Sequence, residues 1–394
     1  MRQPWRVPSE REQKLPVDAE PPIELEVAPG DLLVSRANTR QLLGSAALVT
    51  PSSARLVQCD KLYRIATRTD VLDQRYLARA FASAWVRHQL ERDATGTSDS
   101  MQNTIQQSIR ELELPIPPPK DQLLIADFLD RETERIDALV AKKQRLIELL
   151  QEKRTALISH AVTKGLDPDV PMKDSGIEWL GAIPAHWDAG PLRRFWDVVD
   201  CKHLTVSFHG EGVPVASIGE VKGTAVDLTD AKLTTREEAS QLSEGGRKPG
   251  RGDVIISRNA TVGEAALVET DSDFCLGQDV SLIRSAENDQ RYLVYLLQSP
   301  SIRRQIEAEM IGATFRRINV GCIKDLQVLR PEVQEQLAIG RFCDGVLRAY
   351  SDAVARMIAA IDRLREYRSA LITAAVTGQI DVNSRQARRQ AEGL

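Results

Sequence analysis

The 394-residue sequence predicts an α/β (α+β) protein with two globular domains on mixed β-sheets and two long antiparallel coiled-coil helices, related by an internal pseudo-two-fold repeat. Three observations predict this fold. The stretches Arg154–Asp167 and Arg368–Asp381 are identical at eight of fourteen positions. Each closes a long apolar pattern with helical spacing. Before each helix, short β-rich runs alternate with Gly, Asp, Ser and Asn.

The repeat extends over most of the chain. Colinear matches at several separate places indicate one long unit present twice, whereas a solenoid would show more copies of a shorter period. The matched segments are Gly30–Arg36 with Gly252–Arg258, Gly44–Val49 with Gly263–Val268, Asp73–Leu77 with Asp289–Leu293, and Gln122–Leu123 with Gln336–Leu337.

Composition shifts along the chain predict five segments. Residues 1–119 form a first globular domain and residues 167–330 a second one. Residues 120–166 and 331–381 are helical, with prolines before each helix and glycines near each end, where helices commonly start and stop. Residues 382–394 are a polar tail.

The first globular segment is expected to lack opening strands that the second has. In the second copy, Trp187 of "GAIPAHW" stands far before Gly252, whereas few residues precede Gly30 and no IPxHW occurs among them. A sheet without its opening strands exposes apolar surface and unpaired edges. The first domain is therefore expected to be incomplete, because the true start lies upstream or because the chain is a natural truncation.

The two helical segments carry apolar seams at spacings of three, four and seven residues, with charges of both signs around them. Such a seam requires another helix against it. Two matching helices related by a dyad perpendicular to their axes lie antiparallel, although each could instead pack against its own domain. The predicted seam residues are Ile136, Val140, Ile147, Leu150, Leu157, Leu347, Tyr350, Val354, Met357, Ile361, Leu364 and Leu371.

Charge and cysteine usage limit the class of protein. The net charge of −4 counts against a protein that coats nucleic acid electrostatically, although it leaves room for local basic faces. The five cysteines are scattered without a CxxC motif, which favours a reducing cytosol over disulfides or a cysteine-based zinc site. No stretch approaches about 18 uninterrupted apolar residues, so a cytoplasmic protein without a membrane partner is predicted.

Three stretches mark the start of the second globular domain and the two ends of its helix. "DSGIEWLGAIPAHW" (Asp174–Trp187) opens the second globular domain, "EQLAIGRFCD" (Glu335–Asp344) opens its helix, and "EYRSALITAAVTGQID" (Glu366–Asp381) closes it. Together with the duplicated organisation, they resemble the specificity subunit of type I restriction-modification systems. The resemblance covers nearly the whole chain.

The resemblance implies two target-recognition domains, each reading one half of a bipartite site in double-stranded DNA. It implies that the helices act as a spacer and as the dock for two methyltransferase subunits, with restriction subunits joining through the assembly. The subunit itself is implied to be non-catalytic and without a cofactor. S-adenosylmethionine, ATP and Mg²⁺ are then expected on the partner subunits. Two half-sites would lie about one DNA turn apart, roughly 34 Å.

The residues themselves reveal no catalytic site. The sequence contains no phosphate-binding G-x-x-x-x-G-K-[ST] loop, no Asn-Pro-Pro motif and no glycine-rich cofactor loop after a strand. Cys201, His203 and His209 could be imagined as zinc ligands, but nothing else with metal-ligand spacing accompanies them. A surface or phosphate-contacting loop is the preferred interpretation, and no metal site is predicted.

Candidate DNA contacts follow two strands and occupy two loops. Arg and Asn make bidentate contacts with guanine and adenine edges, and Ser, Thr and Lys serve phosphates. Since "GDVIISR" and "GDLLVSR" recur in both copies, their arginines could instead anchor strand ends through structural ion pairs. The candidates are Arg36, Asn38, Arg40, Lys202, Arg247, Lys248, Arg258, Asn259, Thr261, Arg316, Arg317 and Asn319.

Two other classes of function remain open from the sequence. The chain could be a coiled-coil protein-interaction scaffold that does not read DNA, or an enzyme with an unrecognised site. Salt-dependent binding of the assembled complex to duplex DNA distinguishes the specificity subunit from the scaffold, because phosphate contacts release counterions.

Overall fold

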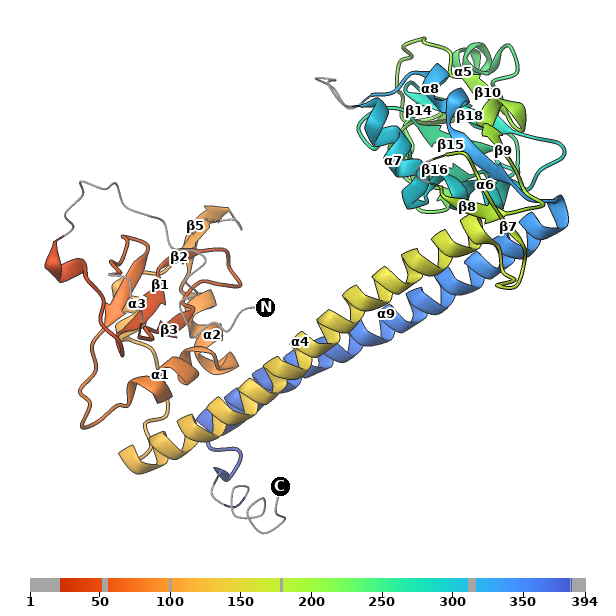
Figure 1. The fold of residues 1–394 in the computed structure, drawn as a ribbon. Helices are drawn as coiled ribbons and strands as arrows, with labels where there is room; N and C mark the ends of the chain where they lie inside the picture. The colour runs from red at the N-terminus through yellow and green to blue at the C-terminus, as the bar shows by residue number, and fades with distance from the viewer. Residues whose placement is uncertain are drawn as a thin grey trace. The chain divides into compact units, whose positions relative to one another are not determined.

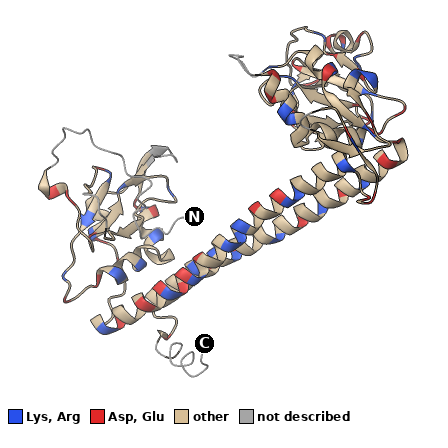
Figure 2. Cartoon of the chain, in the orientation of Figure 1, with Lys and Arg blue, Asp and Glu red and all other residues tan. Residues whose placement is uncertain are grey.

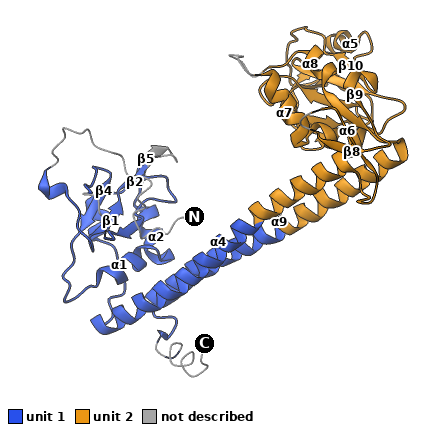
Figure 3. Ribbon diagram, viewed as in Figure 1, with its two compact units in different colours: residues 1–146, 355–394 blue, residues 147–354 orange. Residues whose placement is uncertain are grey.

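The structure is a computed structural model in which the described residues are 22–51, 56–98, 101–177, 180–310, 317–382 and 384. They fall into two compact units (Figure 3). Unit 1 comprises residues 1–146 and 355–394, and unit 2 comprises residues 147–354. Each unit therefore combines one globular segment with about half of each long helix, which differs from the linear division predicted from the sequence.

The globular part of unit 1 is a small antiparallel sheet covered by two helices. Strand β1 (Leu32–Ser35) pairs with β3 (Ala46–Leu48) on one side and β4 (Leu62–Ile65) on the other. Helices α1 (Gln74–Phe81) and α2 (Ala84–Arg92) supply most of the apolar cover. The buried cluster contains Leu32, Val34, Ala46, Leu77, Ala78, Phe81, Val86 and Leu90.

Unit 1 has a second small sheet, whose strand β2 follows β1 in the chain. Strand β2 (Ala37–Asn38) continues directly from β1 and pairs with β6 (Met101–Asn103), which pairs in turn with β5 (Thr95–Ser98). The short helix α3 (Gln106–Arg110) follows. A single turn of 3₁₀ helix, η2 (Ile23–Leu25), precedes β1.

Unit 2 has a six-stranded mixed sheet in the order β10-β18-β15-β16-β13-β12. Figure 1 labels β10, β18, β15 and β16 of this sheet. Its central strands β15 and β18 are mostly apolar and are buried except for Arg284 at the end of β18, the pattern expected of a sheet covered on both faces. The six strands are β10 (Asp197–Asp200), β12 (Val221–Lys222), β13 (Ala225–Val226), β15 (Val254–Ser257), β16 (Ala265–Leu267) and β18 (Val280–Arg284).

Smaller sheets and helices complete unit 2. A three-stranded sheet has the order β14-β11-β17, and two-stranded sheets are formed by β7 with β8 and by β9 with β19. These strands are β7 (Met172–Asp174), β8 (Ala182–Pro184), β9 (Asp188–Pro191), β11 (Val213–Ala216), β14 (Leu233–Thr234), β17 (Cys275–Leu276) and β19 (Gln327–Arg330). The helices are η3 (Leu192–Arg194), α5 (Arg236–Ser243), α6 (Gln290–Leu297), α7 (Pro300–Glu309) and α8 (Val320–Asp325).

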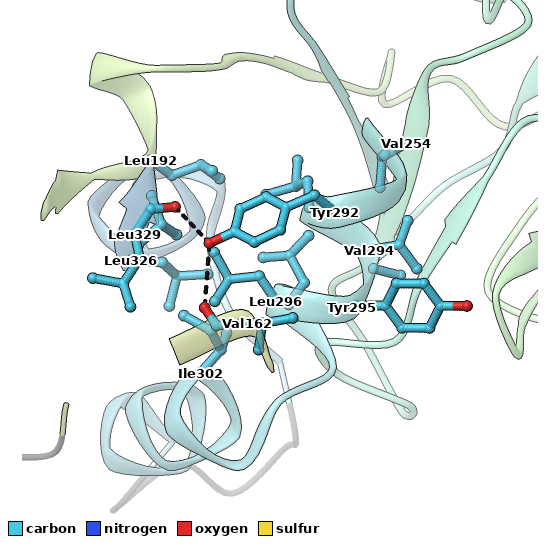
Figure 4. Packing of buried hydrophobic residues seen from close by; sticks show 14 of the residues in the cluster. Val162, Leu192, Val254, Tyr292, Val294, Tyr295, Leu296, Ile302, Leu326 and Leu329 are labelled. Carbon is cyan, nitrogen blue, oxygen red and sulfur yellow. Dashed lines mark hydrogen bonds between the residues drawn. The ribbon is translucent and has the colours of Figure 1, made fainter. Parts of the chain in front are cut away.

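The main core of unit 2 is built around α6 (Figure 4). The Tyr292 ring is fully buried, and its hydroxyl donates to the carbonyl oxygens of Val162 and Leu329 at 3.2 and 3.1 Å. Burial holds the pKa of Tyr292 well above its usual value, so the hydroxyl stays a donor. This single side chain therefore ties the end of the first long helix to the globular core.

The two long helices are α4 (Pro119–Lys164) and α9 (Val333–Val376), close to the predicted bounds. In unit 1, Arg368 of α9 contacts Asp137 of α4, with Nε 3.1 Å from Oδ1. In unit 2, the Arg154 guanidinium of α4 lies 4.8 Å from the Tyr350 ring centroid of α9. Contacts that run in opposite order along the two helices require antiparallel pairing, which confirms the predicted fold class.

Most predicted seam residues are buried or half-buried, as packing against another helix requires. Ile136, Val140, Ile361 and Leu371 are buried, and Ile147, Leu150, Leu347, Tyr350, Val354, Met357 and Leu364 are half-buried. The prediction for Leu157 is wrong, because its side chain is exposed. Ile158 packs against the core instead. The equivalent Leu371 of α9 is buried, so the two copies differ in what covers this position.

The globular parts of both units hold the helices with the same devices, which shows the duplication in three dimensions. The carboxylates of Asp73 and Asp289 cap α1 and α6 by accepting the N–H of Tyr76 and Tyr292. The side-chain oxygens of Gln122 and Gln336, both in the first turn of a long helix, accept the N–H of Asp73 and Asp289 at 2.8 Å. Across the described residues, no helix is long and apolar enough to cross a membrane.

Candidate nucleic-acid interface

The two strongest candidate stretches of unit 2 meet at the end of β15. Asn259 follows this strand and forms an isolated antiparallel bridge with Arg317. Asp279 contacts both residues. Its carboxylate accepts a hydrogen bond from Asn259 Nδ2 at 3.1 Å and forms an ion pair with Arg317 Nη2 at 2.9 Å. Asp279 itself has a positive φ of 65° and its carbonyl accepts the N–H of Arg258. We call Asn259, Asp279 and Arg317 the strand-end cluster.

The strand-end cluster has free donor capacity toward solvent. The Arg317 side chain is 51% exposed, whereas Asp279 is 24% exposed. A guanidinium carries five N–H donors in a fixed fork, so a carboxylate on one side leaves others for an incoming acceptor. Asp279 thus orients Arg317 and leaves it further donors. Asn259 is half-buried and its Oδ1 also accepts the backbone N–H of Ala260 at 2.8 Å, so one amide hydrogen and one oxygen lone pair remain for a base.

Arg258 does not belong to this exposed set. Its side chain is buried, and Nη2 lies 3.0 Å from Asp200 Oδ1 and 3.5 Å from Cys201 Sγ. The guanidinium is enclosed beside β15 and β10, where the carboxylate compensates its charge. Arg258 thus forms the structural ion pair at a strand end that the repeat had suggested as the alternative, and its guanidinium is not available as a DNA contact.

The first copy builds the same frame with other side chains. The Arg36 carbonyl accepts the N–H of Thr104 in unit 1, as the Arg258 carbonyl accepts the N–H of Ile318 in unit 2. The β2–β6 register pairs Ala37 with Asn103. This pair therefore stands where Asn259 and Arg317 stand in unit 2.

The candidate residues of the first copy are only partly available. Arg36 is half-buried, with its guanidinium 5.5 Å from the Tyr63 ring centroid. Asn38 is half-buried and its oxygen accepts the N–H of Thr39. Arg40 is exposed.

The glycine-rich loop before β15 is held by its own contacts. Arg247 is half-buried and donates to the carbonyl oxygens of Asp200 and Glu244, both at 2.9 Å. It therefore braces the loop, and the structure does not favour it as a DNA contact. Lys202 pairs with Glu244 at 2.6 Å. Lys248 pairs with Asp273 at 3.0 Å and is 64% exposed.

The remaining predicted residues divide in three ways. Thr261 is exposed near the strand-end cluster, with its hydroxyl 3.3 Å from that of Ser257. Asn319 caps α8 by accepting the N–H of Cys322 at 2.9 Å, which explains its place in the sequence without DNA. Arg316 lies outside the described residues.

Sequence reasoning missed an exposed aromatic and its lysine. Phe208 is 51% exposed, and the Lys232 ammonium lies 4.8 Å from its ring centroid. In the same loop, Thr205 accepts a hydrogen bond from Gln278 Nε2 at 3.0 Å, next to Asp279. An exposed ring with an adjacent cation suits stacking against a base or sugar. The only sign of this feature in the sequence was the stretch "CKHLTVSFHG", which contains Phe208.

The three residues considered as possible zinc ligands do not all come together. Within the described residues, the metal-ligand atoms of Asp200, Cys201 and His203 lie within 4.8 Å of one another. His209 is not in this group, and its backbone N–H donates to the Leu233 carbonyl. The Arg258 guanidinium already supplies a positive charge at Asp200. Electrostatic repulsion from Arg258 disfavours a cation there.

Lysine, arginine, aspartate and glutamate alternate along both long helices (Figure 2). This mixture is typical of a solvated coiled-coil exterior and provides no continuous basic track. In the parts of the chain that the structure describes, exposed basic residues of unit 2 commonly face an acid, as in Arg251 with Asp271 and Arg303 with Glu264.

The strand-end cluster lies in a stretch that is similar to a known protein family. Residues 209–360 match the type I restriction modification DNA specificity domain. The chain is 20% identical over 324 residues to the EcoBI specificity subunit of Escherichia coli, covering 79% of this chain and 68% of that one. It is 23% identical over 236 residues to the MjaVIII specificity subunit of Methanocaldococcus jannaschii, covering 58% and 53%.

Solved structures share the fold. One from a study of complex assembly and conformational transition of the type I R-M system has a TM-score of 0.70 at 17% identity, covering 90% of this chain and 83% of that chain. The HsdS subunit of Thermoanaerobacter tengcongensis has a TM-score of 0.54 at 16% identity, covering 90% and 82%.

The matched stretch makes the chain similar to a DNA specificity domain, and its fold is that of the solved structures above. More narrowly, the chain is related in sequence and fold to the specificity subunits of type I restriction-modification systems, which confirms the resemblance predicted from the sequence.

Proposed function

We propose that this chain is the DNA sequence-specificity subunit of a type I restriction-modification complex. Each globular domain reads one half of a bipartite target, and the helices dock the methyltransferase subunits, with restriction subunits joining through the assembly. The observation that carries this proposal is the strand-end cluster within the matched DNA specificity domain. Against the alternative of a protein-interaction scaffold, the cluster presents arginine and asparagine, the side chains that read guanine and adenine edges.

The cluster suits base recognition in the major groove. Arginine donates two hydrogen bonds to guanine, and the amide of asparagine both donates to and accepts from adenine. Because Asp279 already fixes both side chains, less conformational entropy is lost when they engage a base edge. Phe208 with Lys232, and the exposed Thr261, add neighbouring contacts of the stacking and phosphate classes.

The repeat supports two different half-sites. Unit 1 presents Ala37 and Asn103 on the frame where unit 2 presents Asn259 and Arg317. A conserved frame with exchanged side chains is what two domains need to read different bases. Many basic residues of this chain pair with its own acidic residues. We therefore assign most of the attraction for the DNA phosphates to the methyltransferase subunits.

The first test maps methylated adenines in cells that carry this chain and its methyltransferase partner. Replacing Asn259 and Arg317 with alanine should relax or weaken recognition at positions of one half-site only, since each bidentate contact contributes about 1–3 kcal/mol. Lys222→Ala, an exposed charge in β12 at the edge of the same sheet, is the matched control. An unchanged methylated sequence in the double variant would contradict the proposed contacts, and DNA binding without salt dependence would favour the scaffold.

The second test concerns the spacer. Inserting seven residues after Arg145 in α4 and after Ala359 in α9, positions that the repeat equates, adds one heptad to each helix and preserves the seam. The added length is about 10 Å at 1.5 Å per residue. We expect the methylated target to gain about three base pairs of spacer, at roughly 3.4 Å each, with both half-sites unchanged. A changed half-site with an unchanged spacer would count against the helices as spacer.

A further inference from the structure

The two units differ at one pair of equivalent positions on the long helices. In unit 1, Arg368 of α9 pairs with Asp137 of α4. The repeat that matches Arg154 with Arg368 also matches Ser351 with Asp137. Unit 2 therefore keeps the arginine and replaces its carboxylate by a hydroxyl.

In unit 1 the chain fills this position itself. The side chains of Arg368 and Asp137 are 16% and 25% exposed. Burial lowers the pKa of Arg368 and raises the pKa of Asp137, and their mutual attraction opposes both shifts. Beside them, Thr373 of α9 accepts the N–H of Ala84 at 2.9 Å, which joins the helix pair to the start of α2.

In unit 2 these contacts are missing, although the arginine is not simply exposed. Arg154 lies over the Tyr350 ring, and its Nε is buried without a hydrogen-bond partner among the described residues. Ser159 stands in the place of Thr373, and Pro300 stands in the place of Ala84. Proline has no N–H, so the link from the long helix to the start of α7 cannot form.

A cavity occupies the resulting space. It has a volume of about 370 Å³ and is lined by Arg154, Ser159, Ser351 and Arg303 together with residues of α6. A groove of about 400 Å³ adjoins it along α7 and is also lined by Arg154 and Arg303, and by Arg304.

The charges around this space are unequal. Glu264 pairs with Arg303, with Oε1 2.6 Å from Nη2, and both Arg304 and Glu307 line the adjoining groove. Tyr295 donates its hydroxyl to Asp344, and burial and that carboxylate raise its pKa, so it stays neutral. Arg154 is left as the cation of the cavity that no carboxylate of the described residues matches.

We propose that this cavity is a binding site for one oxyanion group, a phosphate or a carboxylate, supplied from outside the chain. The group takes the position that the Asp137 carboxylate holds in unit 1. The Arg154 guanidinium offers parallel N–H donors that match two oxygens of such a group, and the hydroxyls of Ser159 and Ser351 supply further donors.

The test is thermal unfolding of the full chain in sodium chloride, sodium phosphate or sodium acetate at equal ionic strength. Phosphate or acetate should raise the melting temperature over chloride by about 2–4 °C once the site is well filled. A response to phosphate alone identifies a tetrahedral ligand, and a response to acetate identifies a carboxylate. Equal melting temperatures in all three salts would overturn the proposal.

Variants assign the response to this cavity. Ser351→Asp restores the carboxylate of unit 1, so it should raise the melting temperature in chloride and abolish the response to phosphate. Arg154→Met should abolish the response while keeping the stem that covers Tyr350. Ser369→Asp, which adds the same charge at an exposed position of α9, should respond as the wild type does. A full response in Ser351→Asp and Arg154→Met, or its loss in Ser369→Asp, would refute the assignment.

Discussion

Aspartate at both Ile361 and Leu364 is expected to separate the long helices in unit 1. Ile361 is buried and Leu364 half-buried on the face of α9 that meets α4. An unpaired carboxylate placed in such a seam costs several kcal/mol, and the lost apolar burial adds about 25 cal/mol per Å². We expect a loss of about 3–5 kcal/mol in the free energy of unfolding, measured by urea denaturation.

The matched control is Ile358→Asp. Ile358 lies on the same helix one turn away and is 49% exposed, so its carboxylate remains solvated and the free energy of unfolding should change by less than about 0.5 kcal/mol. Under the proposed function, the double variant should also fail to copurify with the methyltransferase subunits. A double variant as stable as the control would show that this seam is not needed for folding.

The helix pair was the part of the fold most accessible from the sequence. Arg154–Asp167 and Arg368–Asp381 carry the pattern twice, and two copies of one stripe favour mutual packing over local packing. The spacing does not explain the miss at Leu157, because the equivalent Leu371 is buried. In unit 2 the side chain that packs against the core is Ile158, and this depends on tertiary packing.

The candidate site was predictable only as separate pieces. The sequence identified the stretches around Asn259 and Arg317, but their bridge depends on tertiary folding. Arg258 could not be distinguished from its exposed neighbours because Asp200, which neutralises it, ends a different strand. Phe208 was overlooked because an exposed aromatic is defined by its surroundings, which no local pattern reports.

A second large effect is expected at Asp130, whose contacts in unit 1 differ from those of the equivalent Asp344 in unit 2. Its carboxylate accepts hydrogen bonds from Arg75 at 2.5 Å and from Arg79 Nε at 2.9 Å, and the Arg79 side chain is only 4% exposed. The equivalent Asp344 pairs with the half-exposed Arg291 and accepts the neutral hydroxyl of Tyr295 at 2.6 Å. Tyr295 thus replaces the buried charge of Arg79.

Asp130→Asn should therefore destabilise the protein more than Asp344→Asn does. The first change removes the carboxylate that compensates a buried guanidinium, at a cost of about 3 kcal/mol. The second leaves no buried charge uncompensated and should cost about 1 kcal/mol. Asp127→Asn is the control, since Asp127 pairs with Arg75 at an exposed position where ion pairs contribute little. Urea denaturation of the three variants provides the comparison.

The pKa of Asp130 determines how its contribution to stability changes with pH. Burial raises the pKa of Asp130, but the hydrogen bonds from Arg75 and Arg79 outweigh it, so the folded pKa lies below the ordinary value. A depressed carboxylate pKa contributes stability that is present above the unfolded pKa of about 3.9 and is lost as pH falls through the folded value. The stability difference between wild type and Asp130→Asn should be full at pH 7 and shrink below about pH 4. Equal losses in Asp130→Asn and Asp344→Asn at pH 7 would show that the Arg79 charge is compensated by other groups.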